Sequence, residues 1–239
     1  MKNILKNMVN RRVGNSEIVE VEQLNPEEEE TMFLPIASEA LNITEQYNQI
    51  IFFYEAGICQ LTSKLEILKQ EFQACKNRNP IENIETRVKS PESIKGKMER
   101  RGVPLTVSSM VKNIMDIAGI RVVCPFISDV YYIADFLLRQ EDIETIQIKD
   151  YIKNPKENGY RSLHLIVMVT VYFSDHKCDV PVEIQLRTIA MEFWAALEHQ
   201  LRYKKNRNRM EGLQKQLKQC AELITAADCK MQQLADQWL

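Results

Sequence analysis

The sequence lacks the glycine-rich motifs that mark the commonest nucleotide-binding and hydrolytic sites. Its seven glycines form no GxxxxGKS/T loop, no GxGxxG and no GxSxG, so those common motifs are excluded. Histidine is also scarce. The three histidines and six scattered cysteines include no CxxC pair and no cluster with zinc spacing, so a structural metal site is not expected.

Long apolar runs are missing as well. No segment reaches the length that spans a bilayer, and no long apolar segment follows the basic residues near Met1. Together with the scattered cysteines, these absences predict a reduced, soluble and cytoplasmic protein. A content of 45% hydrophobic and 27% charged residues over 239 positions is typical of one globular domain with additions.

Charge is distributed unevenly, although the net charge is only −2. Residues 17–30 contain seven glutamates and no lysine or arginine, whereas residues 87–101 contain six basic residues and two acids. Residues 1–38 include the acidic run and little periodic apolar content. We expect them to form a mobile or loosely packed extension, with the folded domain over residues 39–239.

Apolar periodicity divides the domain into helices and strands. Helices are predicted over residues 41–72, 90–102, 106–115, 129–138 and 189–203, with one helix or a pair over 210–237. Strands are predicted over residues 84–89, 117–124, 146–149, 163–173 and 178–187. Because strands and helices are mixed without a strict βαβ rhythm, the pattern predicts an α+β fold with a mixed sheet of about five strands.

The segment from Asp150 to His164 combines turn signals with binding groups. Asn154-Pro155 and Asn158-Gly159 are turn dipeptides that precede an apolar strand. The same segment carries several cations and hydrogen-bonding groups around one aromatic residue: Lys153, Lys156, Tyr160, Arg161, Ser162 and His164. An aromatic ring between cations suits a nucleotide. A solvated turn before a buried strand explains the pattern equally well.

Three further sets of polar residues interrupt apolar elements. They are Arg87, Lys89, Lys97 and Arg100; Asp116 with Arg121; and Glu183, Gln185 and Arg187. In the last set, alternation places Glu183 and its polar neighbours on one face and Val182 and Ile184 on the other. Two isolated carboxylates among cations are what a magnesium-assisted phosphate reaction requires.

The alternative for each cation is a solvated charge or a buried ion pair, such as Arg121 with Glu183. Strict alternation from Asp116 would place Asp116 and Arg121 on opposite faces of the strand. We therefore expect Asp116 to lie in the preceding turn, or at a bulge beside Gly119.

Four motifs, in order, resemble the synthetase domain of the RelA/SpoT alarmone enzymes. They are RVKSPESIKGKMERRG, DIAGIRV, YIKNPKENGYRSLH, and VEIQLRT followed by EFWAALEHQLRYK. The resemblance covers about Arg87 to Lys204, and the flanking long helices resemble the compact small alarmone synthetases. It implies a nucleotidyltransferase-like fold and transfer of the β,γ-pyrophosphate of ATP to the 3′-hydroxyl of GDP or GTP.

The resemblance also implies roles for individual residues. The ATP site would use Arg87 and Arg121 for adenine, and Lys89, Lys97 and Arg100 for the phosphates. Asp116 would bind Mg²⁺, and Glu183 would place the metal or take the proton of the 3′-hydroxyl, two roles that stay open. The acceptor site would comprise Tyr160 stacked on guanine, Lys156, His164, Gln185 and Arg187.

Assembly and alternative functions follow from the same resemblance. A homotetramer held by the flanking helices is expected. The basic run Arg202, Lys204, Lys205, Arg207 and Arg209 could contact single-stranded RNA, although phosphate binding or solvation explains it equally. A hydrolase activity is not expected, because no His-Asp dipeptide is present. The alternatives are a toxin-like pyrophosphokinase acting on adenine nucleotides or tRNA 3′ ends, and a non-catalytic RNA- or nucleotide-binding module.

Overall fold

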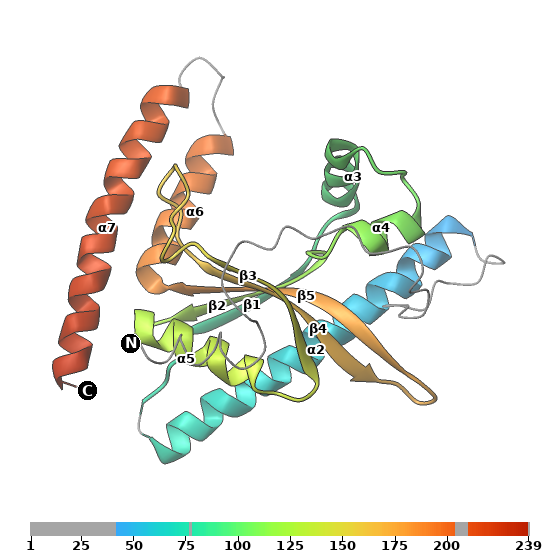
Figure 1. Ribbon diagram of the computed structural model, residues 1–239, viewed down its shortest axis with the longest axis horizontal. Helices are drawn as coiled ribbons and strands as arrows, with labels where there is room; N and C mark the ends of the chain where they lie inside the picture. Colours follow the sequence, from blue (N-terminus) through green and yellow to red (C-terminus); the bar gives the residue numbers. More distant parts are fainter. Residues whose placement is uncertain (1–41, 77, 204–209, 239) are drawn as a thin grey trace, which may run out of the picture. The chain divides into compact units, whose positions relative to one another are not determined.

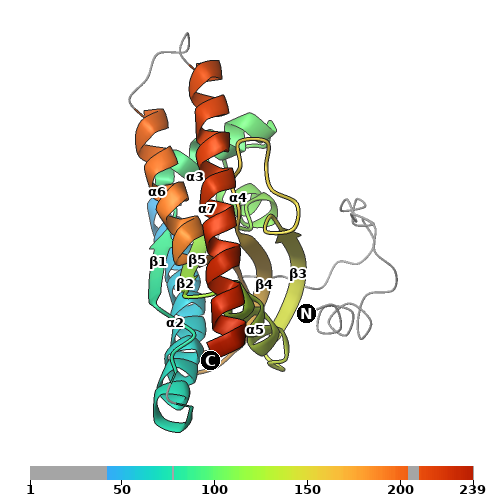
Figure 2. The same cartoon turned by 90° about the vertical axis from the view of Figure 1, so that its left-hand side faces the viewer.

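The computed structural model describes residues 42–76, 78–203 and 210–238, which form a five-stranded sheet and the helices around it (Figure 1, Figure 2). The expected extension over residues 1–38 lies outside these ranges. So do residues 204–209, and with them most of the C-terminal basic run. Within the described ranges, no helix combines the length and the apolar character that a membrane span requires.

The sheet is mixed. Its strands are β1 (Asn83–Val88), β2 (Ala118–Cys124), β3 (Ile143–Asp150), β4 (Leu163–Tyr172) and β5 (Lys177–Thr188). They lie in the order β1-β2-β5-β4-β3. β2 and β5 are parallel, whereas the other neighbouring strands are antiparallel. The α+β fold expected from the sequence is therefore confirmed.

A long helix, α2 (Ile43–Cys75), covers one face of this sheet, as Figure 1 shows. Its buried side chains recur at helical spacing from Ile50 to Phe72, as the sequence predicts. Gly57 sets how closely the helix approaches, because a Cβ at this position would lie 2.8 Å from Cγ1 of Val180. The shorter helix α5 (Ile127–Leu138) contacts β2, β3 and β5.

Two short helices, α3 (Pro91–Arg101) and α4 (Val107–Asn113), connect β1 to β2. The start of α3 is the predicted one: the Ser90 side chain accepts a hydrogen bond from the backbone N–H of Ser93 at 3.3 Å, and Pro91 occupies the first helical position. Gly102 ends the helix in the left-handed conformation, with φ of 66°.

The chain after the sheet forms α6 (Ile189–Tyr203) and then α7 (Met210–Trp238), which lie side by side in both views (Figure 1, Figure 2). Residues 210–238 therefore form one helix, and the alternative of a pair is wrong. Trp194 joins the two helices, since its Nε1 donates to the carbonyl oxygen of Leu217 at 3.0 Å.

Strand β3 is longer than the predicted residues 146–149. Its pairing with β4 shifts between Thr145 and Gln147, which leaves Ile146 as an extra residue with 46% of its surface exposed. Because a bulge interrupts alternation, the pattern before Ile146 is out of phase with the pattern after it. Periodicity therefore identified only the second half of the strand.

Candidate active site

The sheet face opposite α2 is polar along four neighbouring strands. Residues paired directly across two strands point to the same face. Arg87 of β1 is paired with Gly119 of β2, which is paired with Glu183 of β5. One step along, Arg121 is paired with Gln185, which is paired with His164 of β4. The register thus gathers predicted residues from four strands.

Asp116 lies at the β2 end of this face, between two lysines. It occupies the turn before the strand, as predicted, and its Oδ2 lies 2.6 Å from Nζ of Lys89 and 2.7 Å from Nζ of Lys97. Burial alone would raise the pKa of Asp116, but hydrogen bonds and charge from the two lysines outweigh burial and lower it. The carboxylate is therefore ionised at neutral pH.

The residues here fit a hard divalent cation. Oδ1 of Asp116 is buried and has no hydrogen-bond partner, so it presents free lone pairs beside a compensated charge. Glu183 lies close enough for its pKa to respond to the charge of Asp116. Among the described residues, no group of three or more His, Cys, Asp or Glu forms a complete metal cage. Two carboxylates suit Mg²⁺, which takes its remaining ligands from water and phosphate.

Glu183 is held by polar side chains from two strands. Its Oε1 lies 3.2 Å from Nδ1 of His164, and its Oε2 accepts a hydrogen bond from Nε2 of Gln185 at 2.8 Å. Burial would raise the pKa of Glu183, yet its hydrogen bonds and the His164 imidazole lower it overall. The carboxylate is thus fixed in direction and ionised at neutral pH.

Tyr160 projects from the loop between β3 and β4 toward the same residues. Arg187 Nη2 donates to the Tyr160 hydroxyl oxygen at 2.7 Å, and that oxygen lies 2.8 Å from Nε2 of His164. When the Tyr160 hydroxyl donates a hydrogen bond to Nε2, the imidazole carries its proton on Nδ1, which donates to Oε1 of Glu183. A continuous chain of hydrogen bonds therefore connects Arg187 to Glu183.

The ring of Tyr160 is bordered by cations, as the sequence predicts. Nζ of Lys156 lies 4.9 Å from the ring centroid, and the Arg187 guanidinium carbon lies 5.2 Å from it. A tight turn fixes the ring, with Gly159 at φ of 89° and the backbone N–H of Tyr160 donating to Oδ1 of Asn158 at 3.2 Å. The ring is therefore held by the backbone as well as by its hydroxyl.

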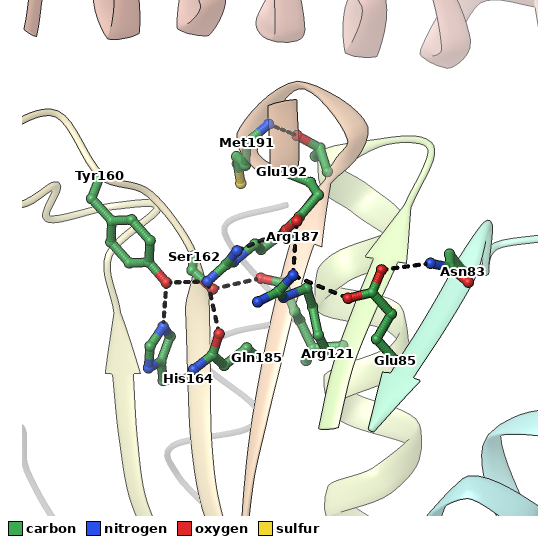
Figure 3. A network of polar contacts seen from close by, with 12 residues as sticks. Asn83, Glu85, Arg121, Tyr160, Ser162, His164, Gln185, Arg187, Met191 and Glu192 are labelled. Carbon is green, nitrogen blue, oxygen red and sulfur yellow. Dashed lines mark hydrogen bonds and ion pairs between the residues drawn. The ribbon is translucent and has the colours of Figure 1, made fainter. Parts of the chain in front are cut away.

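Two arginines share one carboxylate in the network of Figure 3. Nη1 of Arg121 lies 2.9 Å from Oε1 of Glu192, and Nη1 of Arg187 lies 2.7 Å from Oε2 of the same residue. Arg121 also pairs with Glu85 at 3.1 Å. The ion pair of Arg121 with Glu183, considered as an alternative from the sequence, is replaced by these two contacts.

A small pocket opens between Arg87 and Arg121. Its lining residues come from three strands: Glu85, Thr86, Arg87, Gly119, Ile120, Arg121 and Gln185. The Arg87 side chain lies across Gly119, because a Cβ there would be 3.4 Å from Cγ and Nε of Arg87. Lacking a side chain, Gly119 leaves room for Arg87 against the strand, and Arg121 is a second guanidinium in the lining of the pocket. A planar ring fits such a space.

Not every polar residue of the loop belongs to this site. Arg161 points toward α7, where it donates to the Thr225 hydroxyl at 3.3 Å and lies 3.9 Å from the Asp228 carboxylate. Ser162 is buried and donates to the carbonyl oxygen of Leu186 at 3.1 Å. Lys153 pairs with Asp150 at 3.7 Å. These three residues shape the loop, and Arg100, on α3 one turn from Lys97, remains exposed.

Two glutamates of the network were missed by sequence reasoning. Glu85 shares the alternation of Arg87 on β1, which was a usable signal for a residue on the polar face. Glu192 lies in the first turn of α6, where acidic residues are common for the helix dipole alone. Its contact with both arginines depends on how α6 leaves β5, which no local pattern records.

Comparisons with known proteins agree with this geometry. A family model described as "Region found in RelA / SpoT proteins" matches residues 86–208. The GTP pyrophosphokinase YwaC of Bacillus subtilis is 42% identical over 189 residues, which cover 79% of this chain and 90% of that protein.

Solved structures show the same likeness. The small alarmone synthetase 1 from Bacillus subtilis bound to its product pppGpp has a TM-score of 0.74 at 32% identity, over 81% of this chain and 98% of that one. The structure of that synthetase bound to AMPCPP has a TM-score of 0.68 at 28% identity, over 81% and 98% of the two chains.

The two lysines on Asp116 lead to a stability prediction. Asp116→Asn should lower the free energy of unfolding at pH 7 by about 1–3 kcal/mol, the range for losing a charged hydrogen-bond partner. The substitution leaves two partly buried ammonium groups without an anion between them. Urea unfolding measures the difference.

Its pH dependence follows from the lowered pKa of Asp116. The wild-type advantage is complete above the unfolded-state pKa of about 4 and is lost as the pH falls through the lower folded-state pKa. The difference should therefore be constant from pH 5 to pH 7. Asp142→Asn, which removes the anion from a single lysine, Lys64, and alters an acceptor of Gln60, is the matched control and should lose less. An Asp116→Asn protein as stable as the parent would contradict the prediction.

Proposed function

This chain belongs to the RelA/SpoT family, and on that premise we propose that it is a GTP pyrophosphokinase that makes (p)ppGpp. The 3′-oxygen of GDP or GTP bonds to the β-phosphorus of ATP, and the bond from that phosphorus to the α,β-bridging oxygen breaks. AMP leaves, and the 3′-hydroxyl loses its proton. The observation that carries the proposal is that Asp116 and Glu183 lie together on a face lined with cations.

The donor site of the proposal is the pocket between Arg87 and Arg121. The guanidinium groups of Arg87 and Arg121, which both line this pocket, suit the adenine of ATP. Lys89 and Lys97 both pair with Asp116, and Arg100 follows Lys97 by one turn of α3. These three cations would hold the phosphates and compensate the charge that develops during transfer.

Asp116 and Glu183 would hold Mg²⁺ together with phosphate oxygens of ATP. The free Oδ1 of Asp116 supports this assignment. When bound, the ion would neutralise the polyphosphate and orient it toward the acceptor. Lys89 and Lys97 meanwhile keep the Asp116 carboxylate ionised, and therefore ready to accept a cation.

The acceptor site of the proposal surrounds Tyr160. Its ring would stack on guanine, and Lys156 and His164 would reach the phosphates or ribose of the acceptor. Nη2 of Arg187 donates a hydrogen bond to Oε1 of Gln185 at 2.7 Å, and the two residues complete the same strand face. Arg187 also donates to the Tyr160 hydroxyl, which connects the stacking ring to this strand face.

The role of Glu183 follows from its lowered pKa. A general base is most effective when its pKa is near the working pH, and Glu183 is more acidic than an ordinary glutamate. Phosphoryl transfer asks little of a base, because its transition state is loose. We therefore assign Glu183 mainly to orienting the 3′-hydroxyl and holding the metal, with His164 fixing its carboxylate.

A transfer assay tests the function. With γ-labelled ATP and Mg²⁺, the label should pass to GDP or GTP, but not to adenine nucleotides or to tRNA. Purified product incubated with the protein, with or without Mn²⁺, should stay intact. Transfer only to an adenine nucleotide or to tRNA would replace the guanosine assignment by the corresponding alternative.

In the same assay, Glu183→Gln should lower turnover at least ~100-fold, because it removes a group that acts in the transition state. ATP binding should persist, since Arg87, Arg121 and the lysines are unchanged. Glu144→Gln, which alters an exposed glutamate on β3, is the matched control and should keep full turnover. Near-normal turnover of Glu183→Gln would remove Glu183 from the mechanism.

Tyr160→Ala should weaken the use of GDP or GTP by roughly 10- to 100-fold, from a stacking energy of about 1–3 kcal/mol. The affinity for ATP measured without an acceptor should hardly change, because other residues bind adenine. Tyr160→Phe keeps the ring and loses only the hydrogen bonds of the hydroxyl, so its effect should be smaller. Steady-state kinetics with each nucleotide varied separately measures both.

Tyr172→Ala is the control for this series, because it removes an exposed tyrosine at the far end of β4, 69% exposed. A Tyr160→Ala variant that loses ATP affinity and keeps acceptor affinity would show that the two sites are assigned the wrong way round.

We also propose a homotetramer, as expected from the flanking helices. Large apolar side chains remain exposed on α2, α6 and α7, among them Ile67 at 65%, Phe193 at 57% and Leu223 at 74%. Light scattering at micromolar concentration should give four times the chain mass of 27.9 kDa. A monomer mass across this range would contradict the proposal.

A further inference from the structure

Glu192 occupies a central position that the proposed reaction does not use. Its two carboxylate oxygens hold Arg121 at 2.9 Å and Arg187 at 2.7 Å (Figure 3). The side chains are largely shielded from water, with exposures of 21% for Glu192, 28% for Arg121 and 6% for Arg187. Shielding strengthens such contacts relative to surface ion pairs.

The start of α6 does not require Glu192. The helix is capped by Thr188, whose hydroxyl oxygen accepts a hydrogen bond from the backbone N–H of Met191 at 3.1 Å. The Thr188 hydroxyl in turn donates to Oδ2 of Asp228 at 2.9 Å, which anchors the cap to α7. The particular contribution of Glu192 is therefore its contact with the two arginines.

Each arginine belongs to a different part of the site. Arg121 lines the small pocket beside Arg87. Arg187 donates to the Tyr160 hydroxyl at 2.7 Å, on the acceptor side. Glu192 is thus the shared partner of one donor-site residue and one acceptor-site residue. The series Arg121–Glu192–Arg187–Tyr160 is a continuous physical connection between them.

We propose that Glu192 is a positioning residue that couples the occupancy of the two nucleotide sites, an inference that rests on the proposed function. A base in the pocket fixes Arg121, and Arg121 fixes the rotamer of Glu192. Glu192 then holds Arg187 against the Tyr160 hydroxyl. Binding of the first nucleotide therefore completes the ordering of these four side chains. The second nucleotide binds more tightly because less ordering remains.

Glu85 provides an internal comparison. It also pairs with Arg121, at 3.1 Å, but its other carboxylate oxygen accepts a hydrogen bond from Nδ2 of Asn83 at the edge of the sheet. Removing the Glu85 charge disturbs Arg121 from the side away from the acceptor. A change at Glu85 should therefore affect the donor nucleotide alone, whereas a change at Glu192 should affect the communication between the nucleotides.

The test measures binding without turnover. AMPCPP replaces the scissile α,β-bridging oxygen with carbon, so it can be titrated by calorimetry with Mg²⁺ in the absence or presence of saturating GDP. The ratio of the two AMPCPP dissociation constants is the coupling. Thermodynamic reciprocity requires the same ratio when GDP is titrated with and without AMPCPP. In the parent protein we expect a ratio of at least about 5, the lower end for coupled sites.

Glu192→Gln is the main variant because it keeps the size of the side chain and leaves a single acceptor oxygen for two arginines. We expect its ratio to fall to within about twofold of unity, because the two arginines contact different oxygens of Glu192, and the amide replaces one of them with an NH2 donor that faces a guanidinium. Glu85→Gln should weaken AMPCPP binding and keep the parent ratio. In steady-state kinetics, Glu192→Gln should abolish the dependence of the KM for ATP on GTP concentration.

Three results would overturn the inference and leave the proposed function intact. The first is a parent ratio of one although both nucleotides bind. The others are a parent-like ratio in Glu192→Gln, or a loss of coupling in Glu85→Gln as large as that in Glu192→Gln. The transfer assay on the parent separates these failures from a failure of the proposed function. If the parent transfers no label to GDP or GTP, the function and the inference fail together.

Discussion

Parallel pairing of β2 with β5 sets the geometry on which the site depends. Because Gly119 is paired with Glu183, the turn that holds Asp116 comes next to the second carboxylate. The register is fixed from the other face, where Val182 and Ile184 are fully buried against α2. A slip by one residue would turn Glu183 into the apolar core, which is far more costly than any gain on the polar face.

Compensation of charge explains how so many ionised groups share this face. Each carboxylate of the network is held by at least one cation or amide: Asp116 by two lysines and Glu192 by two arginines. Both Arg121 and Arg187 nevertheless retain a buried Nε without a partner. The face thus pairs its carboxylates and still keeps donors and one free carboxylate oxygen, which the proposed function assigns to phosphates and a cation.

Local patterns in the sequence predicted the elements and much of the site. Alternation placed Glu183 on the polar face, and the Ser90-Pro91 pair fixed the start of α3, because both depend on neighbouring residues alone. The direction of Arg161 toward α7 and the position of Glu192 between two arginines were not predicted. Both features depend on where α6 and α7 pack. The sequence of α7, one helix of 29 residues, contains no local pattern that identifies the residues it will contact. The bulge at Ile146 likewise interrupts the alternation of β3, so the alternating pattern predicted only half of that strand.

The packing of α7 extends the proposed acceptor side of the site beyond the region that the family model matches. That region ends at residue 208, and α7 begins at Met210. A Cβ at Gly159, next to Tyr160, would nevertheless lie 2.4 Å from Cβ of Ala221, so the turn and the helix are in direct contact. Arg161, on the other side of Tyr160, reaches Thr225 one turn along α7. The backbone that aims the tyrosine ring is thus held from both sides by α7, and the position of the ring depends on the C-terminal helix as much as on the loop that contains it.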